Sequence, residues 1–215
     1  MADITESIRP RWWLGMRSAF AKFVLRLGGW RFHTTCDINL MDGDQVHRLP
    51  PKFIVFGEPH THWADLPLML LFFWAYRLPR VHFPVRQRYF TPLLGTWLRW
   101  MGAVPVDTSR TNGMVSQMVE QLRAADRMII HIPPSGTRRR TERWRSGFWH
   151  IARQAEVPVF MGYLDASTRR FGYAPPMTLT DDVGYDMDRI RTFYADKRGL
   201  VPANESVIKL KEEGP

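Results

Sequence analysis

The amino-acid sequence predicts an α/β fold, a single domain with a mostly parallel or mixed sheet flanked by helices, with an amphipathic helix at the N-terminus. Short apolar runs alternate along the chain with longer segments of helical periodicity. The length of 215 residues, 45% of them hydrophobic, suits one domain with a sizeable core. The expected organisation is the N-terminal helix within residues 1–30, the α/β domain over 31–200, and a polar, mobile tail over 201–215.

The predicted strands are short apolar runs separated by turn residues and helices. The clearest of them contains the sequence Phe-Ile-Val-Phe at positions 53–56 and is expected to be buried. In chain order the strands cover 30–35, 52–57, 80–85, 103–107, 127–132, 158–164 and 170–173, the last of them at an edge of the sheet.

The predicted helices carry apolar residues at spacings of three and four. Met114, Met118 and Leu122 show this spacing in one of them, and a pair of glycines at 28–29 ends the first. Asp181 and Asp182 stand near the start of the last helix, where negative charge is favoured. In chain order the helices cover 8–28, 64–76, 87–101, 112–125, 145–155 and 181–198.

The first helix is strongly amphipathic. Lys22 and Arg26 lie opposite its apolar face, an arrangement typical of a helix in a membrane interface. The alternative is a helix that packs on the core of its own domain. The apolar face is formed by Trp13, Met16, Phe20, Phe23, Val24 and Leu27.

The net charge of +9 and the pI near 10.2 imply an anionic partner. Nucleic acid is not expected, because no RNA-binding or helix-turn-helix signature accompanies the charge. An anionic membrane surface or a phosphorylated substrate is expected instead. A single cysteine, Cys36, excludes an internal disulfide and a multi-cysteine metal site. Without a signal peptide or an apolar run of about 20 residues, the expected location is cytoplasmic, peripheral to the inner face of the membrane.

The main candidate site is the segment Pro-His-Thr-His-Trp-Ala-Asp at 59–65, between the strand 52–57 and the helix 64–76. If the turn folds His60 over the first turn of the helix, Asp65 can bond one ring nitrogen and leave the other free as a general base. No serine or cysteine nucleophile lies in the segment, which favours direct transfer to a bound hydroxyl. His62 is a competing base. A metal site is the alternative, with another ligand from His131, His150 or a distant carboxylate.

Two further segments place polar groups after predicted strands. The first runs from Gly102 through Asp107 to Arg110, whose guanidinium could bind an anion. The second is Pro-Pro-Ser-Gly-Thr-Arg at 133–138, where backbone N–H groups around Gly136 could face an anion and the following arginines add charge. Without a function, Arg110 would be a surface arginine on a turn. The segment 133–138 would then be a solvated basic loop.

In this order and spacing, the three segments resemble the glycerolipid acyltransferase family of the lysophosphatidic acid acyltransferase type, over about residues 52–164. His60 and Asp65 match the family motif His-x-x-x-x-Asp, and residues 134–138 match Pro-Glu-Gly-Thr-Arg at four of five positions. Downstream, the family often has a basic residue two positions before a glycine, which Arg145-Ser-Gly matches. It then has a strand with Val-Pro, which Val157-Pro158 matches. The chain departs from the family pattern at two positions. Ser135 stands where the family has glutamate. Thr108 stands where the family has arginine, and in this chain the arginine, Arg110, comes two residues later.

The resemblance implies an O-acyltransferase. His60 would be the base and Asp65 its orienting partner, with no metal and no other cofactor. The donor would be an acyl thioester on CoA or acyl carrier protein, and the acceptor a lysophospholipid-like hydroxyl compound. A metal-dependent hydrolase and a non-catalytic lipid-binding or membrane-binding module remain the alternatives. The expected substrate-binding residues are Arg110, Ser135, Gly136, Thr137, Arg138 and Arg145.

Overall fold

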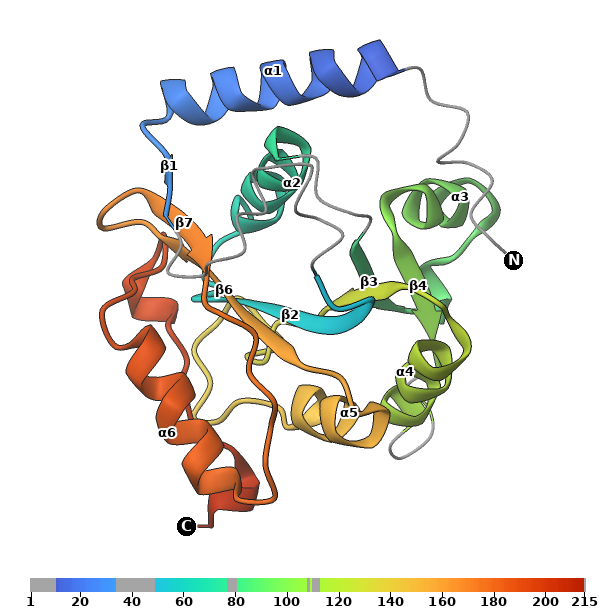
Figure 1. Cartoon of the computed structure of the whole chain (residues 1–215), viewed down its shortest axis with the longest axis vertical. Coiled ribbons are helices and arrows are strands. Elements are labelled where there is room, and N and C mark those ends of the chain that lie inside the picture. Colours follow the sequence, from blue (N-terminus) through green and yellow to red (C-terminus); the bar gives the residue numbers. More distant parts are fainter. Residues whose placement is uncertain (1–10, 34–48, 77–80, 108, 110–112, 215) are drawn as a thin grey trace.

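The computed structural model describes residues 11–33, 49–76, 81–107, 109 and 113–214 (Figure 1). Seven strands form one sheet in the order β1-β7-β6-β2-β5-β3-β4. Strands β2 to β6 run parallel to one another, whereas β7 runs antiparallel to β6. The bounds are β1 Arg31–Phe32, β2 Lys52–Glu58, β3 Val81–Arg86, β4 Ala103–Val106, β5 Met128–His131, β6 Val159–Asp165 and β7 Arg170–Tyr173.

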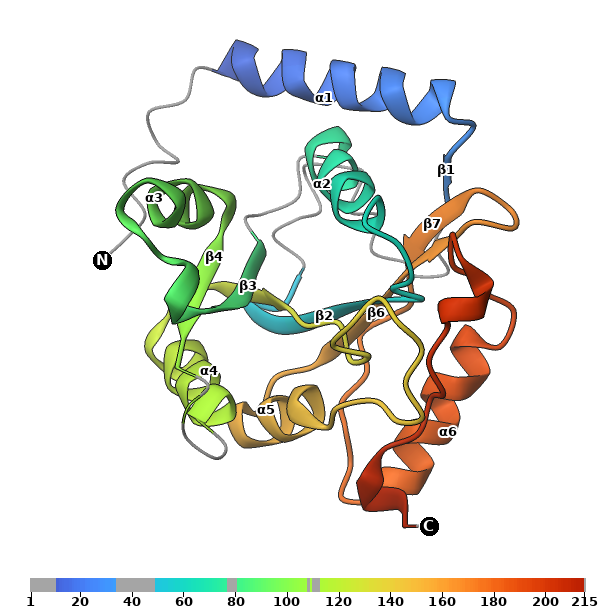
Figure 2. The same cartoon turned by 180° about the vertical axis from the view of Figure 1, so that it is seen from behind.

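Helices cover both faces of this sheet, which confirms the predicted fold class (Figure 1). On one side lie α1 Arg11–Leu27, α2 Asp65–Ala75 and α3 Pro92–Met101, and on the other α4 Gly113–Ala124, α5 Gly147–Ala155 and α6 Val183–Tyr194. The view from behind shows the same division (Figure 2). The larger core cluster contains Ile54 and Phe56 of β2, which are fully buried together with α5 and α6 residues such as Phe148 and Ile190. The opposite face of β2 points toward α2.

Two of the predicted strands and helices need correction. The segment 170–173 is not at the edge of the sheet, because β1 pairs with β7 on its outer side. Gly172 permits this pairing, since a Cβ there would overlap the carbonyl of His33. The helix predicted over 87–101 is divided into a short 3-10 helix, Gln87–Tyr89, and α3, which starts at Pro92 because proline suits the first turn of a helix.

The two faces of α1 have different surroundings. Ser18, Ala21 and Leu25 face α2 and are buried, and the Ser18 hydroxyl donates a hydrogen bond to the carbonyl of Ala75 at 2.7 Å. Four of the apolar residues predicted for the other face are 59% to 72% exposed; they are Met16, Phe20, Phe23 and Leu27. Within the described chain, no helix has the length and hydropathy needed to cross a membrane. The helix therefore packs through Ser18, Ala21 and Leu25 and leaves Met16, Phe20, Phe23 and Leu27 uncovered.

The C-terminal segment is packed, so the prediction of a mobile tail after residue 201 is wrong for the described residues. Leu210 is fully buried in the larger core cluster. The N–H of Trp144 donates to the carbonyl of Lys209 at 2.8 Å, and the Arg191 guanidinium contacts the Glu213 carboxylate at 2.6 Å. Single apolar residues such as Leu210 within a polar sequence were not recognised as core residues.

Candidate active site

The loop between β2 and α2 brings His60 and Asp65 together. Their Nδ1 and Oδ2 atoms are 3.2 Å apart. The same carboxylate oxygen accepts the backbone N–H groups of Thr61 at 2.7 Å and His62 at 2.8 Å. Asp65 is the first residue of α2 and is buried, so its charge lies at the helix end where backbone N–H groups are unpaired. These contacts hold the carboxylate in one orientation against the imidazole.

The geometry distinguishes the two histidines. A carboxylate at Nδ1 of His60 favours the tautomer with its proton on Nδ1, which leaves Nε2 free to accept a proton. His60 also lines the cavity beneath the loop. The ring of His62 instead accepts the N–H of Ala64 at 3.2 Å through Nδ1, and His62 is not among the cavity-lining residues. His60 is therefore the better placed base.

Residues near the C-terminus support this loop. Thr61 is buried, and its hydroxyl accepts the N–H of Val201 at 3.1 Å while its carbonyl accepts the side-chain amide of Asn204 at 3.1 Å. A Cβ at Gly199 would lie 2.5 Å from the Thr61 side chain, so the two segments are in close contact. No local sequence pattern predicts this support, because the partners are about 140 residues apart.

Glu58, the last residue of β2, is a buried carboxylate that the sequence analysis missed. Its Oε2 accepts the N–H of His60 at 2.8 Å, and its Oε1 accepts the N–H of Ser135 at 2.9 Å. Burial raises the pKa of the Glu58 carboxyl, and hydrogen bonds from Ser135 and His60 and the positive charge of His60 act in the opposite direction. Glu58 therefore joins the His60 loop to the loop that follows β5.

The loop after β5 collects several of the predicted substrate-binding residues. Ser135 is buried, whereas Arg138 is exposed. Gly136 has a φ of 64°, and a Cβ there would lie 2.7 Å from Nε of Arg145, so the loop requires glycine for both its backbone conformation and this contact. The Thr137 hydroxyl accepts the N–H of Arg139 at 3.3 Å. Arg110 lies outside the described residues.

An apolar cavity of about 340 Å³ lies between the sheet and α2, within the range of roughly 300–1,000 Å³ usual for ligand pockets. Its floor follows one face of β2, where Phe53, Val55 and Gly57 alternate with core residues on the other face. Its α2 wall includes Leu66, Met69, Phe72, Phe73 and Tyr76. The step from Phe53 to Glu58 corresponds to roughly 16 Å along the strand. The cavity is therefore long enough for an extended apolar chain.

His131 ends β5 and lies in the cavity wall. Burial, with a smaller contribution from the charge of His60, lowers its pKa from 6.5 to about 4. The sequence suggests His131 only as an alternative metal ligand. Among the residues that the structure describes, no group of three histidine, cysteine, aspartate or glutamate side chains is placed to hold a metal ion. His131 thus adds a neutral imidazole to the cavity at physiological pH.

The shifted pKa of His131 predicts how the free energy of unfolding depends on pH. Between pH 6.5 and about 4 the unfolded chain binds a proton at this position and the folded chain does not, so stability falls as the pH falls through this range. Chemical denaturation at pH 7.5 and pH 4.5 should show that His131→Gln loses roughly 2 kcal/mol less than the wild-type protein. Equal losses in the two proteins would contradict the assignment.

A half-buried histidine beside a buried aspartate, above an apolar cavity on an α/β sheet, is an arrangement suited to an enzyme. The family model named Acyltransferase matches residues 44–161, more than half of the chain. The chain therefore belongs to the Acyltransferase family, as the three sequence motifs indicated, and is an acyltransferase.

One solved structure shares the fold. It is the crystal structure of the 1-acyl-sn-glycerophosphate (LPA) acyltransferase PlsC from Thermotoga maritima, with a TM-score of 0.53 and 14% sequence identity over 91% of this chain and 80% of that chain. No curated protein sequence matches the chain. At this identity the structural likeness establishes the shared fold.

Proposed function

We propose that the protein is an O-acyltransferase that transfers a fatty acyl chain from an acyl thioester, on CoA or acyl carrier protein, to a hydroxyl group of a lysophospholipid-like acceptor. The observation that carries this proposal is the position of His60, which lines the apolar cavity while Asp65 holds its Nδ1. The cavity offers an acyl chain an apolar wall over most of its surface. A base at its rim is close to where the carbonyl group of such a chain would lie.

In the proposed reaction, Nε2 of His60 accepts the proton of the acceptor hydroxyl as its oxygen attacks the thioester carbonyl. The new C–O bond forms, the C–S bond breaks, and the thiolate leaves with the proton that His60 took up. Asp65 stabilises the imidazolium between these steps. Backbone N–H groups near Gly136 are candidates for binding the oxyanion. No metal or prosthetic group takes part.

Arginines near the loop after β5 supply the proposed binding site for an anionic head group. Arg145 lies against Gly136, and Arg138 is exposed on the same loop. Arginine suits this role because its planar guanidinium binds phosphate in a bidentate manner. The departures at Ser135 and Thr108 leave the identity of the acceptor open, so a phosphate-bearing lipid is proposed only as a class.

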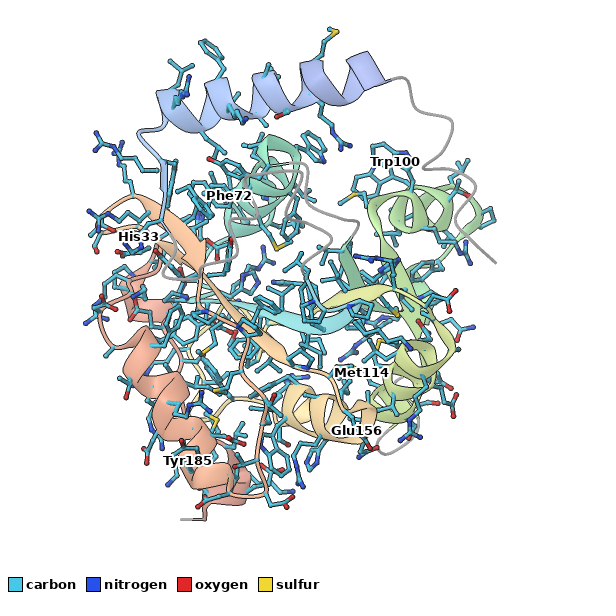
Figure 3. All side chains as sticks on the ribbon, viewed as in Figure 1. His33, Phe72, Trp100, Met114, Glu156 and Tyr185 are labelled. Carbon is cyan, nitrogen blue, oxygen red and sulfur yellow. The ribbon has the colours of Figure 1, made fainter. Side chains whose placement is uncertain are left out.

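Membrane binding is proposed to bring the acceptor to the site. Besides α1, the helix α3 exposes Leu93 (89%), Trp97 and Trp100, and both helices lie on the same side of the sheet as the cavity (Figures 1 and 3). Exposed aromatic and aliphatic residues on a chain of net charge +9 suit an anionic membrane interface. The proposed location is therefore the inner face of the cytoplasmic membrane.

Vesicle sedimentation tests this membrane interaction. With vesicles of phosphatidylcholine and phosphatidylglycerol, Phe20→Ser/Phe23→Ser should bind at least about tenfold more weakly than wild type, because each buried phenylalanine contributes roughly 1.5–3 kcal/mol. Tyr185→Ser is the matched control, since Tyr185 is 55% exposed on α6, on the other side of the sheet (Figure 3). Unchanged binding by the double variant would contradict the membrane surface assigned to α1.

Lipid mass spectrometry tests the reaction itself. Purified protein, labelled acyl-CoA and a membrane extract should yield a labelled lipid whose mass reports both the acceptor and the transferred chain. The His60→Ala variant should yield none above background. Transfer at the normal rate by this variant would show that His60 is not the base, and hydrolysis of the thioester without a labelled lipid would argue against an acyltransferase acceptor site.

A further inference from the structure

Glu58 is a buried carboxylate that the proposed reaction does not use. Its side chain is almost fully buried, yet it lies in the cavity wall beside His60. Both of its oxygens accept backbone N–H groups, one from the segment that carries His60 and one from Ser135. A buried charge is costly unless it is bonded in this way, so the position is expected to have a specific role.

The two backbone partners of Glu58 belong to the two loops that must stay aligned for acyl transfer. The His60 loop follows β2, and the Ser135–Gly136 loop follows β5, which is the parallel neighbour of β2 in the sheet. Ser135 N–H and His60 N–H both point at one carboxylate, so they fix the separation of the loops through a single group. The hydrogen bonds are within 2.9 Å, which is typical of a charged acceptor.

Ser135 lies in the segment 134–138, at the position where the family motif Pro-Glu-Gly-Thr-Arg has glutamate. The Ser135 N–H is 2.9 Å from a Glu58 oxygen, so a carboxylate occupies the space next to position 135 although the residue there is neutral. The side chain that provides it comes from β2 instead of from the loop. The region beside Ser135 therefore contains an acidic group in this chain, supplied by β2.

We propose that Glu58 is a positioning residue of the acyl-transfer site, and that its carboxylate takes the place of the acidic side chain that the third motif lacks at Ser135. This inference rests on the proposed function. Glu58 contacts neither the acceptor hydroxyl nor the thioester; it acts by holding His60 and the Ser135–Gly136 loop.

A charge exchange between the two positions tests the proposal. Glu58→Ala should lower kcat about 100-fold with a small change in the KM for the acyl donor, since a misplaced base costs rate more than substrate binding. Ser135→Glu alone should also be slow, because it places two carboxylates side by side in a buried site. The double variant Glu58→Ala/Ser135→Glu should return to within about tenfold of the wild-type kcat, because one carboxylate again faces both loops.

Thermal unfolding of the same four proteins provides a readout that needs no substrate. Ser135→Glu should unfold at a lower temperature than wild type, and the double variant should recover most of the loss. A wild-type protein without acyltransferase activity would defeat the proposed function, and the unfolding data would then decide whether the two positions share one carboxylate. The inference about Glu58 is overturned if the double variant is as slow as Glu58→Ala, or if the effects on unfolding are additive.

Discussion

Acyl transfer by Asp65→Asn should be about 10³–10⁴-fold slower than by the wild-type enzyme. The carboxylate of Asp65 lies 3.2 Å from Nδ1 of His60 and favours the tautomer with a free Nε2. An asparagine amide at this position can present N–H to the ring, which favours the opposite tautomer and removes the base. It also stabilises the imidazolium less, because it carries no charge.

The loss should be in kcat, measured with saturating acyl-CoA and acceptor. Thr61 and His62 donate to the same Oδ2 that faces the ring, so an asparagine that places its NH2 there also loses these two hydrogen bonds. Circular dichroism should show that the overall fold persists. Adding His60→Ala to Asp65→Asn should cost little more than His60→Ala alone, since the two residues act as one unit. Independent, multiplicative losses would show that Asp65 has a role apart from His60.

A change at the far end of the cavity should alter the selectivity of the enzyme for the length of the acyl chain. Phe53 and Ile129 are aligned in neighbouring strands at the end of the cavity opposite Glu58 and His131. Replacing Ile129 by phenylalanine should shorten the cavity by about two methylene groups, at roughly 0.8 kcal/mol each. The kcat/KM for the longest accepted acyl-CoA should then fall roughly 15-fold.

Short acyl chains provide the internal control, because they do not reach Ile129 and should react at the wild-type rate. Gly57→Val is the contrasting variant. Gly57 lies at the catalytic end of the floor, where an added Cβ would be 3.4 Å from Nε2 of His131, so a valine should slow every chain length alike. If Ile129→Phe slows short and long chains equally, the acyl chain does not extend along β2.

The local pattern of the sequence determined much of this outcome. The alternation of apolar runs and periodic segments predicted the sheet and its helices, because burial on a sheet or a helix imposes these periods directly. The five-residue offset from His60 to Asp65 predicted their pairing, because both residues lie in one short loop at the start of a helix. The amphipathic pattern of the first helix likewise predicted the apolar face that α1 exposes.

Tertiary structure decided the features that depend on residues far apart in the chain. The sequence could not show that Asn204 supports Thr61, that Leu210 is buried, or that β1 covers β7, because each is a contact between distant segments. It also could not show the carboxylate beside Ser135. In the sequence, the segment 133–138 has no acidic residue. The parallel pairing of β2 with β5 brings the Glu58 carboxylate next to the Ser135 N–H, so this contact depends on the register of the sheet.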